Sequence, residues 1–367
     1  MPALRHISVH LPPSAGSSYT VAIGADIVDT AVRELKGFLG SHPSMVLTDD
    51  RVHGIWAAAF VEKLRESGLN IQCACVPEGE RSKSWECAQT VLEKMMSFSL
   101  NRDSGLIAIG GGVVGDLGAF AASIYMRGIS CFHVPTTLLA QVDSCLGGKT
   151  AVDLPTAKNA VGTFHQPKAV YVDTLFLSSL PDSALANGMA EVIKYGAIKD
   201  TSILTLLEQR TLERFKGLSG VWPELVACCL NVKSDVVTRD ERDRGERMIL
   251  NFGHTAGHAL EVVTGFEMPH GEAVAFGMSA ACRISEAMGF IDRSVSRRID
   301  RLLERFGLPT VLPEHVSPEA ILNCLPRDKK ASSGKIRWVL LSDLGHAFVT
   351  DEVPAERIVA ALRGNAG

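Results

Sequence analysis

The sequence predicts a chain of two parts, an alternating β/α fold at residues 1–179 followed by a mainly helical fold at 180–367. Short apolar runs typical of buried strands alternate with helical patterns throughout the first part. After the Leu180-Pro181 dipeptide the pattern is helical as far as about residue 310, which is a change of architecture. The length also suits two domains, because a domain usually holds about 100–200 residues.

Composition places the chain among ordinary globular proteins. It has 367 residues, of which 46% are hydrophobic and 21% charged, and a formal charge of −4 at pH 7. This charge, without a long basic run, argues against nucleic acid or an anionic membrane as the main partner. No apolar run reaches the ~18 residues that span a bilayer, and residues 1–6 do not resemble a signal peptide, so we expect a cytoplasmic protein. The nine cysteines lack CxxC spacing and are expected to be reduced.

The start of the chain predicts a strand ribbon and then a strand-helix-strand unit. The expected elements are ribbon strands at 6–11 and 19–24, a helix at 27–39, strands at 44–50 and 70–76, and a helix at 55–67. Asp49 closes the strand at 44–50, and an open parallel sheet binds a nucleotide ribose at this kind of position. A helix cap would explain Asp49 equally well.

A glycine-rich turn follows the next buried strand, at 105–109. The segment from Gly110 to Asp116 reads GGGVVGD and opens a helix of small residues. Glycines at a strand-to-helix turn let backbone N–H groups approach a diphosphate, and the helix N-terminus adds partial positive charge. We therefore expect a nucleotide to bind at this turn.

Polar side chains follow the strand at 129–134. Thr136 and Thr137 stand at its carboxyl end, where hydroxyl groups can bind a phosphate or a ribose. Lys149 follows two glycines and can meet an anion there. A last strand at 169–173 completes the series.

The second part carries a candidate metal site. If the segment around residue 254 is a helix, His254 and His258 lie one turn apart on one face, with Glu261 on the same stripe. His270 begins the next helix, so three histidines fall within seventeen residues. Two or three imidazoles with one carboxylate, for which Glu191 is the candidate, would form a catalytic zinc site with an open position. Further on, segments 336–341 and 346–349 predict a hairpin, and a final helix follows.

The ordered set of motifs resembles the 3-dehydroquinate synthases, sugar phosphate cyclases of the shikimate pathway. The resemblance is nearly full-length and rests on these segments: 77–84, 110–116, 125–128, 135–150, 158–159, 187–194, 240–261, 270–277 and 328–330. It implies a Rossmann-like NAD-binding domain at 1–179, an α-helical metal- and substrate-binding domain at 180–367, and an active site in the cleft between them.

The resemblance also implies a role for individual residues. The metal ligands would be Glu191, His254 and His270, binding Zn²⁺ with Co²⁺ as a substitute. NAD would contact Asp49, Glu80, Lys83, Gly111, Gly112, Val113, Asp116, Thr136, Thr137, Asp143, Lys149, Lys158, Phe176 and Ser179. The substrate would meet Asp143, Lys149, Asn159, Lys194, Lys233, Arg247, Asn251, His258 and one of Lys329 and Lys330. Arg127 would reach in from a partner subunit of a homodimer.

Arg247 and Asn251 are four residues apart. If the helix that holds His254 begins early enough, their side chains share a face with this histidine and point toward the substrate.

The implied reaction converts 3-deoxy-D-arabino-heptulosonate 7-phosphate into 3-dehydroquinate and phosphate, by transient oxidation with NAD, β-elimination, reduction and an intramolecular aldol step. Two alternatives share much of the pattern. One is another sugar phosphate cyclase, such as an amino-dehydroquinate, valiolone or inosose synthase. The other is a metal-dependent glycerol or alcohol dehydrogenase, against which the cluster of cationic residues argues.

Overall fold

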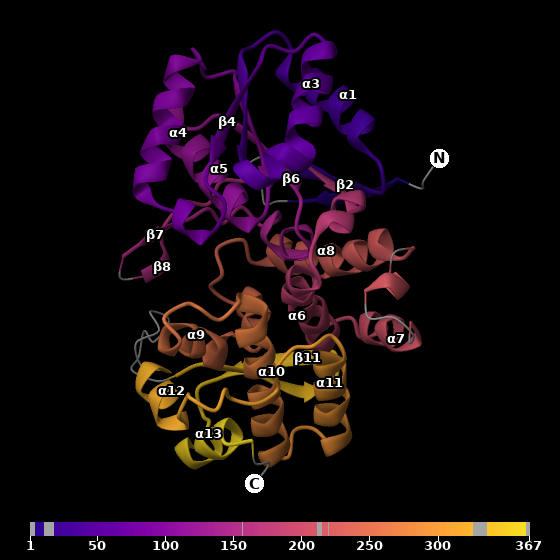
Figure 1. Ribbon diagram of the computed structural model, residues 1–367. Coiled ribbons are helices and arrows are strands. Elements are labelled where there is room, and N and C mark those ends of the chain that lie inside the picture. The colour runs from indigo at the N-terminus through magenta and orange to yellow at the C-terminus, as the bar shows by residue number, and fades with distance from the viewer. Residues whose placement is uncertain are drawn as a thin grey trace. The chain divides into compact units, whose positions relative to one another are not determined.

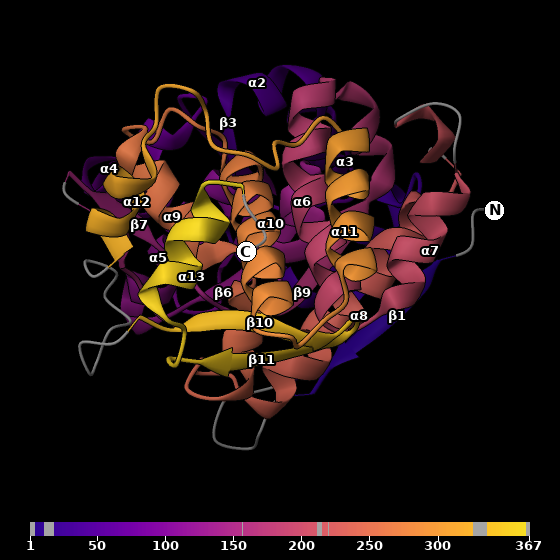
Figure 2. The same ribbon diagram turned by 90° about the horizontal axis from the view of Figure 1, so that it is seen from below.

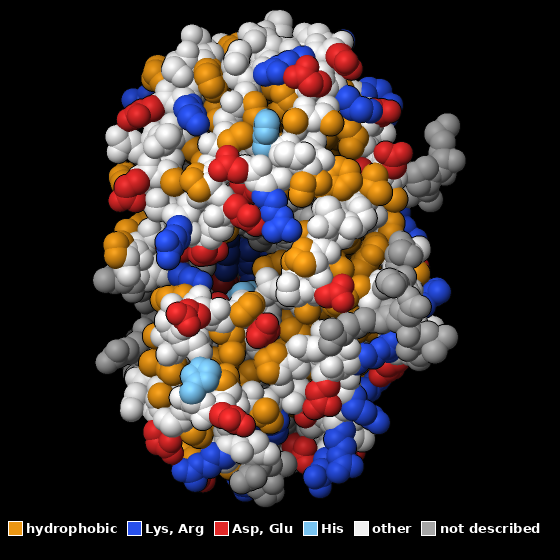
Figure 3. Space-filling model, in the orientation of Figure 1, with side chains coloured by type: hydrophobic (Ala, Val, Ile, Leu, Met, Phe, Trp, Pro, Cys, Tyr) orange, Lys and Arg blue, Asp and Glu red, His pale blue; other side chains and the backbone are white. Residues whose placement is uncertain are grey.

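The computed structural model describes residues 4–10, 18–155, 157–210, 215–218, 220–325 and 336–364. Its contacts divide the chain into two compact units, Met1–Pro181 and Asp182–Gly367 (Figure 1). The nine cysteines are recorded as thiols. Acidic and basic side chains are interspersed on the face that Figure 3 shows. No helix among the described residues is long and apolar enough to cross a membrane.

The N-terminal unit is built on a seven-stranded sheet in the order β1-β2-β9-β6-β5-β3-β4. The strands are β1 Arg5–Val9, β2 Tyr19–Gly24, β3 Ser44–Asp49, β4 Ile71–Val76, β5 Gly105–Gly110, β6 Ser130–Pro135 and β9 Ala169–Asp173. β1 pairs antiparallel with β2, which is the predicted ribbon, and every other neighbouring pair is parallel. All six residues of β3 and of β5 are buried, because a parallel sheet is covered on both faces.

Helices cover the two faces of this sheet (Figure 1). One face packs against α1 Val28–Leu39, the π-helical turn η1 His53–Ala57 and α3 Ala58–Glu66, and the other against α4 Trp85–Ser97 and α5 Gly112–Ile124. Consecutive residues of β5 show the alternation: Leu106 faces the core under α4 and α5, and Ile107 faces the core under α1 and α3.

The strand order reverses between β3 and β5. The chain moves outward from β3 to the edge strand β4, crosses back to β5, and then continues in the other direction to β6. Ligands of open α/β sheets bind beyond the carboxyl ends of the strands at such a reversal. The segments that follow these ends are short: α2 Asp50–Val52, η2 Glu80–Ser82, η4 Ala140–Ser144 and η5 Thr174–Ser179. The turn η3 Tyr125–Arg127 lies instead between α5 and β6.

A small hairpin was not predicted from the sequence. It pairs β7 Val152–Leu154 with β8 Ala157–Val161 and carries Lys158 and Asn159. Its strands are short and mostly half-buried or exposed, and they show no alternation of apolar residues that would indicate a strand.

The C-terminal unit is helical, with one hairpin. Its elements are α6 Asp182–Ile198, α7 Thr201–Gln209, η6 Lys216–Leu218, α8 Trp222–Arg239, η7 Glu246–Asn251, α9 His254–Val263, α10 His270–Ala287, α11 Arg293–Arg305, α12 Pro318–Cys324, β10 Trp338–Asp343, β11 His346–Thr350 and α13 Ala355–Leu362. Helix α10 is almost entirely buried. Figure 2 shows the predicted hairpin, β10 with β11, beside α10 and α11.

Candidate active site

Glycines allow three helices of the C-terminal unit to approach one another closely. A Cβ atom added to Gly271 would lie 2.1 Å from the main-chain oxygen of Asn187 in α6. One added to Gly277 would lie 1.8 Å from the main-chain oxygen of Gly253, at the start of α9. Asn187 also accepts a hydrogen bond from the N–H of Gly271 through its side-chain oxygen. At these glycines, therefore, the main chain of α10 directly contacts the main chain of α6 and of the residue that precedes α9.

This packing brings Glu191, His254 and His270 together. Their potential ligand atoms all lie within 4.8 Å of one another. Oε1 of Glu191 lies 3.6 Å from Nε2 of His254 and 3.5 Å from Nε2 of His270. Glu191 comes from α6, and the two histidines are the first residues of α9 and α10. Two imidazoles and a carboxylate form the three-ligand set of a catalytic zinc, with a fourth position for water or substrate.

The second nitrogen of each imidazole faces an oxygen atom. Nδ1 of His254 lies 3.1 Å from the main-chain oxygen of Phe252, and Nδ1 of His270 lies 3.4 Å from Oε1 of Glu261. Because a carbonyl oxygen only accepts hydrogen bonds, Nδ1 of His254 carries the proton and Nε2 is left as the donor to a metal. Oxygen partners behind a histidine ligand fix its ring orientation and increase its basicity.

The two histidines differ in charge. Burial lowers the pKa of His254 well below its ordinary value, and the charge of Lys194 adds to this effect. Burial also acts to lower the pKa of His270, but hydrogen bonds to Glu191 and Glu261 outweigh it and raise the pKa to about 9. Without a metal, His270 is thus protonated at neutral pH and His254 is neutral.

His258 lies beside these residues and outside the three-ligand group. Its ring centroid is 5.2 Å from that of His254 and 6.4 Å from that of His270. From the sequence, we expected two or three histidines as ligands. Among the described residues, only His254 and His270 form a group with Glu191 in which the potential ligand atoms lie close together.

Three of the predicted substrate-binding residues of this unit are buried cations. Lys194, Lys233 and Arg247 are only 2%, 6% and 3% exposed. Lys194 forms an ion pair with Glu191, one helical turn away. Their positive charges make this unit suited to an anionic ligand. Lys329 and Lys330 lie outside the described residues.

The helix that holds His254 does not begin early enough to include Arg247 and Asn251. These residues belong to the 3₁₀ turn η7, and α9 begins only at His254. Gly253 between the two elements has φ +82°, in the left-handed region, which interrupts the helix. In a 3₁₀ turn with three residues per turn, residues four apart do not share a face. Asn251 instead donates from Nδ2 to the main-chain oxygen of Met248, at 3.0 Å.

In the N-terminal unit, Asp49 stands at the carboxyl end of β3. It caps α2, because its Oδ1 accepts a hydrogen bond of 2.8 Å from the N–H of Val52. The sequence left a cap and a ribose ligand as alternatives, and the two roles are compatible because a carboxylate has several acceptor positions. Burial raises the pKa of Asp49, and the hydrogen bond from Val52 opposes this change.

The glycine-rich turn forms a cradle at the end of β5. Gly111 caps α5, and a Cβ atom added to it would lie 3.1 Å from the Thr137 side chain. A Cβ atom added to Gly112 would lie 3.3 Å from Oγ of Ser144. Beside them, the buried hydroxyl of Thr136 has no hydrogen-bond partner among the described residues. Free N–H groups at a helix start and an unsatisfied hydroxyl are suited to the phosphates and ribose of a nucleotide.

Lys83 connects the η2 loop to α5 and the small hairpin. Its Nζ lies 2.5 Å from Oδ2 of Asp116 and 2.5 Å from Oδ1 of Asn159. Burial acts to lower the pKa of Lys83, but the charges of Asp116 and Glu80 outweigh it and raise the pKa. Asn159 has φ +52°, in the left-handed region that asparagine tolerates better than most residues.

The remaining predicted cofactor and substrate residues of this unit differ in exposure. Those that are partly or fully exposed are Glu80, Val113, Asp143, Lys149, Lys158 and Ser179. Phe176 is only 2% exposed and packs against Trp56, with ring centroids 5.1 Å apart. Ser179 accepts a hydrogen bond of 2.9 Å from Nε1 of Trp56. Phe176 thus belongs to the core under α1 and α3, and its contact with NAD stays a prediction.

Known proteins match most of this chain in sequence. Family models described as the N-terminal and the C-terminal parts of 3-dehydroquinate synthase match residues 73–187 and 188–331. A 3-dehydroquinate synthase from Thermoanaerobacter pseudethanolicus is 42% identical over 347 residues, which cover 94% of this chain and 97% of that protein.

The chain belongs to the 3-dehydroquinate synthase family. The resemblance inferred from the sequence motifs is therefore confirmed, and the dehydrogenase alternative is not favoured.

Two solved structures share the fold of this chain. 2-Epi-5-epi-valiolone synthase from Streptomyces hygroscopicus, with NAD⁺ and Zn²⁺ bound, is 25% identical and has a TM-score of 0.85, covering 96% of this chain and 98% of that chain. 2-Deoxy-scyllo-inosose synthase, in complex with carbaglucose-6-phosphate, NAD⁺ and Co²⁺, is 24% identical and has a TM-score of 0.85, covering 98% of this chain and 100% of that chain. The predicted fold class is confirmed.

Two residues of the synthase site were not assigned a role from the sequence. Glu261 stood on the histidine stripe, and its spacing from His254 was the only signal for it. Asn187 lies one turn before Glu191 and holds the start of α10 through Gly271. Both contacts join α10 to another helix, which a one-dimensional pattern does not show.

Proposed function

We propose that this chain converts 3-deoxy-D-arabino-heptulosonate 7-phosphate into 3-dehydroquinate and phosphate, as a cytoplasmic homodimer that uses NAD and a divalent metal. The observation that carries the proposal is the convergence of Glu191, His254 and His270 in a unit that also buries Lys194 and Arg247. The three ligands suit a hydroxyl-bearing substrate, and the cations suit its carboxylate and phosphate.

Each unit has its own part in this proposal. Residues 1–179 bind NAD through Asp49, the glycine turn and Thr136, and residues 180–367 bind the metal and the substrate. NAD, when bound, supplies a hydride acceptor that returns the hydride within the same turnover, and the metal supplies a Lewis acid. Nε2 of His254 and of His270 and the carboxylate of Glu191 hold the metal.

The buried cations would bind and orient the anionic groups of the substrate. Lys194 lies beside the ligand Glu191, so its ammonium group can neutralise charge close to the metal. The guanidinium of Arg247 presents planar paired donors, which suit a phosphate or a carboxylate. The Arg247 N–H and its neighbours donate to Asp240, and this fixes the turn that carries the side chain.

The reaction itself is tested by incubating the chain with the heptulosonate phosphate, NAD and Zn²⁺. We expect released phosphate and carbocyclic product in equal amounts, with catalytic NAD sufficient and no accumulation of NADH. NADH that rises in proportion to product would instead support a dehydrogenase. Turnover only with an amino analogue of the substrate would support an amino-dehydroquinate synthase.

The metal ligands are tested with His254→Ala and a matched control, His346→Ala. His346 is an exposed histidine of β11, far in the sequence from the ligand set. We expect His254→Ala to lose bound metal on dialysis against a chelator and to lose turnover, because two protein ligands rarely hold zinc. Full retention of metal and activity in His254→Ala would contradict the assignment.

The homodimer is supported by Arg127, an exposed residue in a strained loop. Met126 and Arg127 have φ +50° and +69°, and two consecutive non-glycine residues in this region are uncommon. We propose that Arg127 reaches the site of a partner subunit.

Mixing inactive Arg127→Ala and His254→Ala chains tests this. Exchange of subunits should restore about a quarter of the sites, because half of the dimers are mixed and one site of each mixed dimer has both residues. A monomer in sedimentation, or no restoration after proven exchange, contradicts the proposal.

A further inference from the structure

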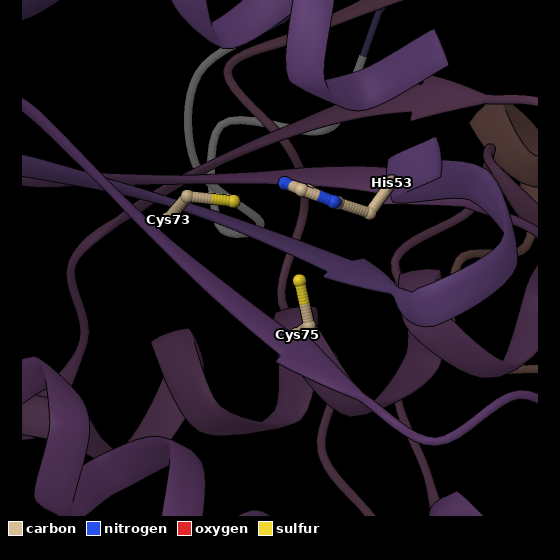
Figure 4. Close-up of side chains that lie close together, drawn as sticks. All are labelled: His53, Cys73 and Cys75. Carbon is tan, nitrogen blue, oxygen red and sulfur yellow. The ribbon is translucent and has the colours of Figure 1, made fainter. Parts of the chain in front are cut away.

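A second group of metal-ligating side chains lies in the N-terminal unit. His53, Cys73 and Cys75 point toward one another in Figure 4, and their potential ligand atoms all lie within 4.8 Å of one another. All three residues are partly exposed, so a hydrated ion can reach them. None of them belongs to the residues assigned to NAD, the catalytic metal or the substrate.

The fold explains why these residues meet. Cys73 and Cys75 are two positions apart on β4, so their side chains lie on the same face of the sheet. β4 is the edge strand and pairs only with β3, opposite Val46 and Thr48 at these positions. The chain leaves β3 through α2 directly into η1, whose first residue is His53. The imidazole thus comes from the segment that follows the strand beside the two thiols.

The turn that carries His53 is itself unusual. η1 is a π-helical turn, closed by a hydrogen bond from the N–H of Ala58 to the main-chain oxygen of His53. Turns of this kind are rare and often occur at functional sites. Val52 and Trp56, on either side of His53, pack on the core under α1 and α3, so the position of the turn is fixed by packing.

The same two thiols are poorly placed for a disulfide. Residues two apart on one strand have Cα atoms about 6.6–6.8 Å apart. This is the upper limit for a disulfide, whose usual Cα separation is about 5.5–6 Å. An imidazole at the same point adds a third ligand, which a disulfide would not use.

We propose that His53, Cys73 and Cys75 form a second cation site, which takes a thiophilic ion of the Zn²⁺ class with three protein ligands and one open position. Thiolate and imidazole ligands select zinc and related soft ions over Mg²⁺ or Ca²⁺. Tetrahedral zinc has Zn–S and Zn–N distances of about 2.3 and 2.0–2.1 Å, so its ligand atoms lie roughly 3.5–3.8 Å apart. Small side-chain rotations bring atoms that now lie within 4.8 Å to this separation.

Ion binding must displace the thiol protons. Burial raises the pKa of Cys73 to about 11, and the neighbouring Cys75 adds to this effect. Burial also raises the pKa of Cys75. An ion must therefore compete with the protons of both thiols. This cost favours a reversible site over a permanent structural one.

Cobalt distinguishes this site from the catalytic one. Co²⁺ bound by thiolates gives a strong near-ultraviolet charge-transfer band, which a site of one carboxylate and two imidazoles does not give. We expect the full chain to bind two Co²⁺ ions and to show this band. Because the band reports only thiolate ligands, it is independent of the proposed roles of Glu191, His254 and His270.

Substitutions then identify the cysteines that produce the band. Cys73→Ser with Cys75→Ser should abolish it and leave one Co²⁺ ion and the enzymatic turnover. The matched control Cys87→Ser, at another half-buried thiol, and the ligand variant His254→Ala should both keep the band. Absence of the band from the unsubstituted chain, or its persistence in the double serine variant, overturns the proposal.

His53→Ala provides a test that leaves both thiols in place. Loss of the imidazole should weaken Co²⁺ binding at this site at least tenfold, measured by titration of the band. An unchanged affinity would show that the two thiols bind the ion without His53 and would overturn the three-ligand site. Circular dichroism shows whether the double serine variant folds. If it does not, His53→Ala alone tests the three-ligand site.

Discussion

The two units build their candidate sites by different means. In the N-terminal unit, the residues of the candidate cofactor site lie on short segments beyond strand ends. The glycines there leave space beside flexible side chains. Cβ atoms added to Gly111 and Gly112 would meet only the side chains of Thr137 and Ser144, at 3.1 and 3.3 Å. In the C-terminal unit, Cβ atoms added to Gly271 and Gly277 would meet main-chain oxygens at 2.1 and 1.8 Å.

This difference separates two uses of glycine. At Gly111 the missing side chain leaves room for a ligand, and a threonine side chain can move by a few tenths of an ångström. At Gly277 the missing side chain lets two helices touch, and a main-chain oxygen cannot move without its helix. The same substitution should therefore affect binding in one unit and folding in the other.

The largest effect is expected from Gly277→Ala. The new methyl group would overlap the main chain of Gly253 and displace the turn that places His254. Overpacking of this severity should lower the free energy of unfolding by about 3 kcal/mol or more. Thermal unfolding, followed by circular dichroism, measures the loss.

Gly37→Ala is the matched control for this substitution. An added Cβ atom meets nothing within 4 Å at this exposed position of α1. Alanine there should be neutral or stabilise by about 0.5–1 kcal/mol, because it favours the helix. Equal stability of the Gly277→Ala and Gly37→Ala chains would show that the helices of the C-terminal unit separate easily.

Features that leave a local pattern in the sequence could be predicted from it. Continuous apolar strands such as β5 predicted the covered parallel sheet, and the change at Leu180 marked the end of the alternation. The spacing of His254, His258 and His270 predicted a metal site, and the structure brings two of these histidines to Glu191. A family resemblance supplied what spacing alone left open, namely which two histidines were expected to be ligands.

Features that depend on tertiary contacts could not be predicted in this way. Lys194 resembles a solvated helix charge in the sequence, and only the fold buries it beside Glu191. The break before α9 depends on the left-handed conformation of Gly253, which the sequence permits without requiring it. The group at His53 joins a π-helical turn to an edge strand, and no motif spacing marks it.

The next effect in size is expected from Arg247→Ala, in the C-terminal unit. A charge-assisted hydrogen bond to a buried anion contributes roughly 1.5–3 kcal/mol, so kcat/KM should fall by about one to two powers of ten. Lys63→Ala is the control, because Lys63 is an exposed partner of Asp29. Equal rates for the two variants with phosphorylated substrate would remove Arg247 from the anion site.

Gly111→Ala should show a smaller effect, and on cofactor binding instead of folding. Its φ of −75° is open to alanine, so the fold should persist with little change in the melting temperature. The added methyl group would occupy the cradle at the start of α5, and NAD affinity should fall about tenfold, or by ~1.4 kcal/mol. Calorimetric titration with NAD measures this. A large loss of stability with unchanged affinity would mean that Gly111 serves packing, as Gly277 does.

The last comparison concerns the pH dependence of metal binding and contrasts His270 with His254. His270 has a pKa of about 9 without metal and must lose its proton to become a ligand, whereas His254 is already neutral. Because His270 releases one proton on binding, metal affinity should increase about tenfold for each unit of rising pH up to pH 9 and then level off. Because this pKa lies above the ordinary histidine value of 6.5, protonated His270 stabilises the metal-free fold below pH 6.5, and this stabilisation is lost as the pH rises through 9.

Glu261→Gln isolates the cause of this dependence. The variant removes one of the two carboxylates that hold the proton on His270, so the plateau in metal affinity should move to lower pH. Zn²⁺ titrations with a competing chelator at several pH values measure both curves. Identical curves for the two proteins would show that Glu261 does not control the proton on His270.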